Sequence, residues 1–166
     1  KLKEIIVALI FTALIRTLIG LVPAIILTAP LFGVSILELG LPLLLLFLSL
    51  YIFGITLGLF VSAGLIRFGP SFENIAWSSL FLLAPLGCIY YPIEILPNFF
   101  QIVAKGLPLV YIFDETRNIL INGYINYENL RQAYYLNLVY LTLGIFLFYF
   151  SFLKARIKGT LINMGE

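Results

Sequence analysis

Residues 90–123 read YYPIEILPNFFQIVAKGLPLVYIFDETRNILING and differ from the rest of the chain. The stretch contains three prolines, three acidic residues and two basic residues among many large apolar side chains. A bilayer-spanning helix needs about 20 mainly apolar residues, so this stretch is too polar and too rich in proline to span. It is also too apolar for an ordinary water-exposed loop. We therefore predict that it enters one face of a membrane without crossing it.

The spacing of breakers within the stretch predicts a helical hairpin. Pro97 favours the start of a short helix that runs to Lys105, and the residues from Gly106 to Pro108 predict a tight turn. A second, amphipathic helix is expected over residues 109–121, with Asn122 and Gly123 as its stop signal. The hairpin as a whole is predicted to be re-entrant and to occupy residues 93–122.

Composition indicates that lipid surrounds most of the remaining chain. Hydrophobic residues make up 62% and charged residues 11% of the sequence, and its mean hydropathy is +1.10. Soluble domains carry about 45–50% apolar and about 25% charged residues. A net charge of +2 gives no indication of nucleic-acid binding. The lipid bilayer is thus an expected partner, and nucleic acid is not.

The apolar runs predict an all-α, polytopic membrane helical bundle that forms one domain over residues 1–166. Four transmembrane helices are expected, and the extracellular re-entrant hairpin lies between the third and the fourth. The first has a second possible register, from after Arg16 to Leu37, and Pro23 and Pro30 are expected to kink or end it. The four predicted spans cover residues 4–29, 37–66, 74–91 and 131–153.

Basic residues near the span ends predict the orientation. Positive residues are enriched in cytoplasmic loops, and placing both ends of the segment in the cytoplasm puts six basic residues inside and three outside. The inside set is Lys1, Lys3, Arg67, Lys154, Arg156 and Lys158, and the outside set is Lys105, Arg117 and Arg131. Because the sequence begins at Lys1 with an apolar helix and no cleavage site, we interpret it as a fragment or processed form.

Chemistry-bearing motifs are missing from the sequence. It has no histidine, one cysteine (Cys88), no Gly-x-x-x-x-Gly-Lys-Ser/Thr phosphate loop and no zinc or nucleophile-elbow motif. We therefore expect no catalytic residue, no metal site and no cofactor in this chain. The expected role is non-enzymatic.

A few residues stand out and leave alternatives open. Arg16 contacts a translocation path or subunit interface, or it snorkels, or it marks the cytoplasmic end of the second register. Gly54 and Gly58 predict a face on which a neighbouring helix packs closely. Glu115 and Arg117, together with Asp114, either hold the second hairpin helix at the mouth of a path or form a solvated helix face.

Three segments resemble those of one transporter family. YYPIEILP (residues 90–97) is similar to the Phe/Tyr-Tyr-Pro…Leu-Pro segment of type-2 ABC export permeases. Residues 107–117 resemble that family's Leu/Asn-Pro-Leu-x-Tyr…Glu-x-x-Arg segment, and residues 64–68 resemble its second cytoplasmic turn. The order of these segments matches the family across nearly the whole chain.

This resemblance implies a function and partners. The chain is expected to be the C-terminal four-helix part of a permease subunit that pairs with a second permease subunit, as a homodimer or heterodimer. Separate ABC ATPase subunits would bind ATP and Mg²⁺, and the coupling helix that contacts them would precede Lys1. The transported substrate would be an amphipathic or a glycan-, lipid- or drug-like cargo exported across a prokaryotic plasma (inner) membrane.

The same resemblance assigns roles to individual residues. The residues expected to shape the outer gate are Pro92, Pro97, Gly106 and Pro108, with Glu115 and Arg117 as its polar members. Arg67 and Glu73 are expected on the cytoplasmic side near the ATPase. Two other classes remain open: a membrane-embedded enzyme or assembly factor that uses Asp114 and Glu115 in a re-entrant substrate loop, and an ion-coupled carrier, which calls for intramembrane charges and inverted repeats.

Overall fold

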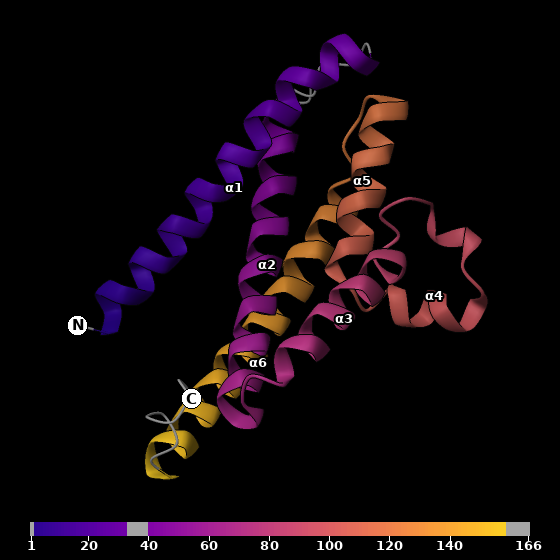
Figure 1. The fold of residues 1–166 in the computed structure, drawn as a ribbon. Coiled ribbons are helices and arrows are strands. Elements are labelled where there is room, and N and C mark those ends of the chain that lie inside the picture. Colours follow the sequence, from indigo (N-terminus) through magenta and orange to yellow (C-terminus); the bar gives the residue numbers. More distant parts are fainter. Residues whose placement is uncertain (1, 33–39, 159–166) are drawn as a thin grey trace. The chain divides into compact units, whose positions relative to one another are not determined.

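The computed structural model describes residues 2–32 and 40–158. The chain divides into two compact units, Lys1–Leu45 and Leu46–Glu166, which we describe separately as unit 1 and unit 2. The elements, labelled in Figure 1, are α1 (Leu2–Phe32), α2 (Leu41–Phe68), α3 (Phe72–Leu86), the 3₁₀ helix η2 (Ile93–Ile95), α4 (Asn98–Ala104), α5 (Pro108–Asn122) and α6 (Tyr127–Lys158). The described residues contain no β-strand, in agreement with the all-α prediction.

Unit 1 consists mainly of α1, which is longer than the first predicted span. Pro23 and Pro30 both lie inside the helix, so neither residue ends it where it stands. Proline lacks the amide hydrogen that bonds the carbonyl four residues earlier. The end of the second predicted register, near Leu37, lies outside the described residues.

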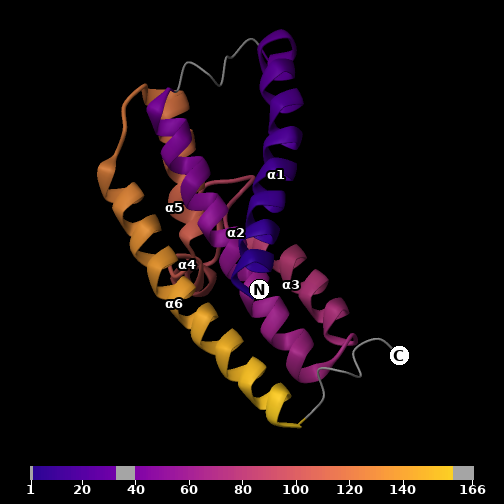
Figure 2. The ribbon, with the colours of Figure 1, turned by 90° about the vertical axis from the view of Figure 1, so that its left-hand side faces the viewer.

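In unit 2, α2 and α6 run in the same direction, as Figure 1 and Figure 2 show. The Asn137 amide of α6 donates hydrogen bonds to the carbonyl oxygen and hydroxyl of Ser49 on α2, at 2.9 and 2.8 Å. Two turns further along, a Cβ placed on Gly144 would lie 3.4 Å from Leu59 and 3.6 Å from the Thr56 carbonyl. The two helices therefore pack in a parallel arrangement through small and polar side chains.

The hairpin segment forms the helices that its sequence predicts. α4 follows Pro97, α5 begins at Pro108, and Gly123 ends α5 with a left-handed φ of +73°. Glycine adopts this conformation without the penalty that a Cβ brings, which makes it the common helix-ending residue. After Gly123 the chain reverses direction, so α6 packs antiparallel to α5 (Figure 2).

The third predicted span differs from the structure. We predicted a helix over residues 74–91, but α3 ends at Leu86, where the Gly87 amide bonds the Leu83 carbonyl at 2.7 Å. Cys88 then adopts a positive φ of 53°, a conformation that is incompatible with a right-handed α-helix. Fifteen residues of α-helix extend about 22 Å, less than the hydrocarbon thickness of about 30 Å.

Three described helices are long and apolar enough to cross a membrane: Phe11–Thr28 within α1, Leu41–Phe68 (α2) and Tyr127–Ile157 within α6. α3 is too short to count among them. The chain therefore has the features of a membrane protein with three candidate spans. The fourth span, the re-entry of the hairpin and the single-domain organisation remain predictions.

Candidate functional site

The turn after α3 and the hairpin share a small apolar core. Cys88 and Ala104 are completely buried and pack with Val110 of α5. The partly buried residues around them are Tyr91, Ile93, Leu96 and Leu107. Gly87 allows the close approach of α5, because a Cβ placed on it would lie 2.8 Å from the Leu109 side chain. The hairpin is thus packed against the end of α3.

Hydroxyl groups fix the turn between α4 and α5. The Tyr140 hydroxyl of α6 donates to the Gly106 carbonyl at 3.0 Å, and the Tyr111 hydroxyl donates to the Lys105 carbonyl at 3.0 Å. Pro108 is buried in the first turn of α5. Backbone amides at this position have no partner within the helix, so the lack of an amide hydrogen in proline costs no hydrogen bond there. Gly106 and Pro108, two predicted gate residues, therefore lie together at the hairpin tip.

The contact with Tyr140 also gives the position of this tip along α6. Tyr140 lies between three and four turns after Tyr127, the first residue of the helix, or roughly 20 Å along its axis. The tip therefore lies beside the middle of a candidate spanning helix.

A polar cluster, which we name the anchor cluster, joins α5 to the start of α6. It consists of Asp114, Glu115, Arg117, Asn126 and Asn129. Glu115 is completely buried, and its carboxylate accepts the Asn126 backbone amide at 2.6 Å and the Asn129 side-chain amide at 3.2 Å. The same Asn129 amide donates to Asp114 at 3.3 Å. Both carboxylates of α5 thus converge on one asparagine.

Arg117 links the anchor cluster to the end of α3. Its guanidinium donates to the Cys88 carbonyl at 2.9 Å and lies 3.6 Å from the Asp114 carboxylate. Two of its nitrogen atoms, Nε and Nη2, are buried without a hydrogen bond. The positive φ of Cys88 accompanies this contact, so one arginine joins α5 to the turn after α3.

Comparison of the chain with protein-family models, with curated proteins and with solved structures finds no match.

The two earlier prolines of the predicted gate lie at helix starts. Pro92 precedes η2 and Pro97 precedes α4, and both have extended ψ angles, of 156° and 147°. They shape the path of the chain between α3 and the hairpin. The structure thus places Pro92, Pro97, Gly106 and Pro108 in one connected segment, with Glu115 and Arg117 further along α5.

The remaining predicted residues lie elsewhere. Arg16 is an exposed residue of α1 in unit 1, within the apolar stretch Phe11–Thr28. Arg67 lies in the last turn of α2 with its guanidinium 5.4 Å above the Phe68 ring. Glu73, in the first turn of α3, accepts a 3.5 Å hydrogen bond from the Trp77 indole. Neither of these two residues contacts the anchor cluster.

Gly54 and Gly58 are exposed on α2. A Cβ placed on either would meet no described atom within 4 Å. No described residue of this chain packs against the two glycines. Close packing of another helix on them stays a prediction.

Four polar residues that unit 2 uses were missed in the sequence. Asn126 and Asn129 lie between the predicted hairpin and the last predicted span, and Asn126 also caps α6 by accepting the Glu128 amide at 3.0 Å. Asn137 and Tyr140 lie within a predicted span. A lone amide inside an apolar helix is the signal that could have identified Asn137, by the same reasoning that selected Arg16.

Within residues 2–32 and 40–158, no group of three histidine, cysteine or acidic residues could hold a metal ion. Asp114 and Glu115 are two carboxylates whose neighbours are amides and a guanidinium. Their arrangement is suited to fixing one helix against another.

Proposed function

We propose that this chain is a permease subunit of an ATP-driven exporter of the type-2 ABC family. A second permease subunit would complete the translocation path, and separate ATPase subunits would supply the ATP hydrolysis. The cargo would be amphipathic or glycan-, lipid- or drug-like. The proposed location is a plasma (inner) membrane, with both ends of this segment in the cytoplasm.

The position of the hairpin tip is the observation that supports this proposal most. The α4–α5 turn reaches the level of Tyr140, well inside the predicted span over residues 131–153. If that span crosses the bilayer, the hairpin enters the membrane from the α5–α6 side and returns, as the resemblance implies. α3 would then enter the bilayer without crossing it and end where the hairpin packs against it.

In the proposed mechanism, the hairpin closes the outer mouth of the path. An ATPase can shift a permease between two states only if it binds them with different free energies. The anchor cluster ties the hairpin to α6, and Arg117 ties it to α3, so a movement of these helices would move the hairpin. Arg67 and Glu73, at the opposite end of unit 2, are the proposed neighbours of the ATPase.

A membrane-embedded enzyme is the second candidate, because Asp114 and Glu115 lie close enough to share Asn129. General acid–base catalysis needs a carboxylate that can reach a substrate. Glu115 is completely buried and bonded on both oxygens, whereas Asp114 is partly exposed. Loss of a chemical turnover in Asp114→Asn would favour this class over a transporter.

Co-purification provides the direct test. The full-length protein, expressed together with a candidate ABC ATPase subunit, is expected to purify as a complex whose ATP hydrolysis rises on addition of cargo. Arg67→Glu is expected to weaken that complex. Arg131→Glu, near the start of α6 and at the opposite end of unit 2, is expected to leave it intact. Transport by the full-length protein without any ATPase partner would contradict the proposal.

A further inference from the structure

The α2–α3 turn and the side of α3 that carries Ile75 and Leu82 form a hollowed surface, which we name the α3 groove. One cavity of about 220 Å³ is lined by Phe68, Ser71, Phe72 and Ile75. A second, of about 340 Å³, is lined by Asn74, Ile75, Ser78, Ser79 and Leu82. Because Ile75 lines both, the two cavities adjoin, and the groove extends from the end of α2 for two to three turns along α3.

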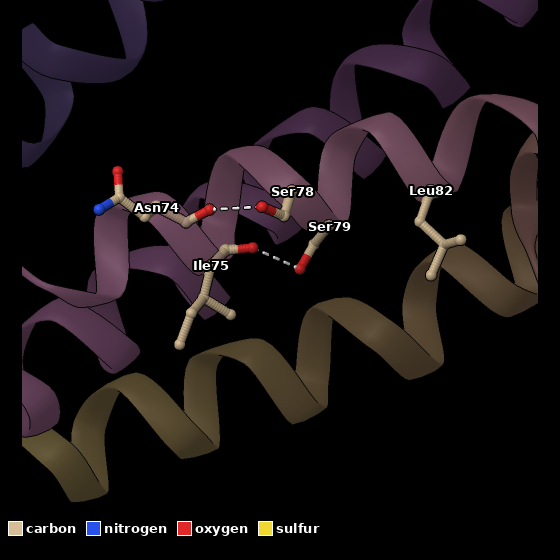
Figure 3. A pocket seen from close by; sticks show the side chains of 5 residues that line it. All are labelled: Asn74, Ile75, Ser78, Ser79 and Leu82. Atoms are coloured by element: carbon tan, nitrogen blue, oxygen red, sulfur yellow. Dashed lines mark hydrogen bonds between the residues drawn. The ribbon is translucent and has the colours of Figure 1, made fainter.

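Most of the groove is apolar. Ile75 and Leu82 project from the same side of α3 (Figure 3), and they are 57% and 63% exposed. The hydroxyls of Ser78 and Ser79 donate to the backbone carbonyls of Asn74 and Ile75, at 2.9 and 2.8 Å (Figure 3). These serines therefore present little unsatisfied polarity, and the far part of the groove is suited to a hydrocarbon chain.

The end of the groove at the α2–α3 turn is polar and positive. The Arg67 guanidinium lies 5.4 Å above the ring of Phe68, which lines the groove. Within the described residues Arg67 has no acidic partner, and the Ser71 hydroxyl makes no capping hydrogen bond. Arginine, hydroxyl and amide donors are the groups that bind phosphate oxygens. Asn74 adds such an amide one turn further on.

The nearest acidic residue does not face the groove. At about 100° per residue, Glu73 lies on the opposite side of α3 from Ser71 and Ile75, together with Trp77. Its carboxylate accepts the bond from the Trp77 indole on that side. The groove therefore combines an apolar channel with a cation at one end, and the acidic residue of its own helix faces away.

We propose that the α3 groove binds one phospholipid with an anionic headgroup. The headgroup phosphate contacts Arg67, Ser71 and Asn74, and an acyl chain lies along Ile75 and Leu82. A cationic end fits an anionic headgroup better than a zwitterionic one, and the elongated apolar part fits a hydrocarbon chain. The site does not depend on the proposed transport function, because the lipid would bind to this chain alone.

Native mass spectrometry of the purified full chain, with any subunits that purify with it, tests this site. Palmitoyl-oleoyl phosphatidylglycerol and the matching phosphatidylcholine serve as probes. We expect one phosphatidylglycerol to bind in preference to phosphatidylcholine. Arg67→Gln is expected to lower the affinity for phosphatidylglycerol roughly tenfold, as for a lost charge-assisted hydrogen bond. Phosphatidylcholine has the same phosphate but a choline cation beside it, so its weaker binding is expected to fall by a smaller factor, and the preference for phosphatidylglycerol is expected to shrink.

Two further variants separate the groove from general attraction to charge. Lys154→Gln removes a cation at the same end of unit 2 whose amine lies 4.4 Å from the Phe150 ring, and it is expected to change nothing. Ile75→Trp fills the groove and is expected to reduce the binding of both lipids. If Ile75→Trp fails to fold, Leu82→Phe fills the second cavity and replaces it.

Three outcomes would overturn the proposal. The first is an equal loss in Arg67→Gln and Lys154→Gln, which would indicate a diffuse electrostatic effect. The second is undiminished lipid binding in a folded, groove-filled variant. The third is an affinity for glycerol phosphate equal to that for phosphatidylglycerol, measured by competition, which would show that the acyl chain contributes nothing. ATPase co-purification is measured separately, so failure of the lipid site and failure of the transport proposal remain distinguishable.

Discussion

At the scale of single residues, Glu115 is the largest side chain that the described part of the chain buries completely. A buried carboxylate requires hydrogen-bond donors, because an unpaired buried charge costs several kcal/mol. The Asn126 backbone amide and the Asn129 side chain provide them. The role of Glu115 is therefore to fix the connection between α5 and α6.

Glu115→Gln is expected to destabilise the protein by about 1–3 kcal/mol, because the new amide group would face the Asn129 amide, donor against donor. Thermal unfolding in detergent measures this effect. Asp114→Asn is the matched control, since Asp114 is partly exposed, and it is expected to cost less than about 1 kcal/mol. Equal losses of stability in the two variants would show that burial of Glu115 has no special importance.

Asn137 is another buried polar residue with a defined partner. Asn137→Leu removes both hydrogen bonds to Ser49 and is expected to lower the free energy of unfolding by about 0.6–1.7 kcal/mol, as measured for other hydrogen bonds between membrane helices. Titration with a denaturing detergent checks this. In a Ser49→Ala background the same substitution is expected to cost less, because one of the two bonds is already absent. Strictly additive losses would contradict the pairing.

At the scale of elements, the hairpin could be predicted from local signals. Pro97, Pro108 and Gly123 act through backbone geometry within a few residues, so the bounds of α4 and α5 follow from the sequence closely. α3 was predicted too long because the apolar run continues past its end. The left-handed turn at Cys88 and its contact with Arg117, far away in the sequence, end the helix, and no local pattern reports such a contact.

The anchor cluster was predicted only in part for the same reason. Asp114 and Arg117 are neighbours on one helix, and their pairing follows from i,i+3 spacing. The partners of Glu115 lie beyond the α5–α6 turn, and their positions depend on how tightly Gly123 reverses the chain. Tyr140 and Gly106 meet across 34 residues. Contacts of this range require the packed structure.

The single cysteine makes the attachment of the hairpin measurable. Cys88 is completely buried, so its thiol is expected to react with a maleimide only when the hairpin opens. Tyr140→Phe removes the hydrogen bond to Gly106 and is expected to speed labelling about two- to tenfold, the equivalent of one net hydrogen bond.

Tyr135→Phe is the control for this labelling experiment, because Tyr135 is 62% exposed on the same helix. It is expected to label as slowly as the unchanged protein. If both tyrosine variants label at the unchanged rate, the Tyr140 hydroxyl does not fasten the hairpin.

At the scale of the whole molecule, the proposed membrane position gives Lys105 a distinctive environment. Lys105 is exposed next to the hairpin tip, at the level of Tyr140. A charged side chain facing hydrocarbon at depth costs at least about 2.5 kcal/mol. In the proposed transporter, Lys105 must therefore face water or the translocation path.

A membrane-impermeant thiol reagent checks this placement in intact cells. Lys105→Cys is expected to be labelled from outside, whereas Phe99→Cys, exposed and apolar on α4, is expected to react at least roughly tenfold more slowly because hydrocarbon covers it. The unchanged protein gives the baseline, since its only cysteine is buried. Equal labelling of both variants would place the hairpin in water rather than in the membrane.

The two tyrosine hydroxyls at the hairpin tip have a consequence for hydration. The carbonyls of Lys105 and Gly106 lie in the turn that follows α4, and carbonyls at a helix end normally bind water. Here Tyr111 and Tyr140 bind them instead. The backbone of the tip can thus leave bulk solvent without losing hydrogen bonds, a step that otherwise costs several kcal/mol per unpaired group in a bilayer. In the folded chain these two carbonyls therefore need no water to complete their hydrogen bonds.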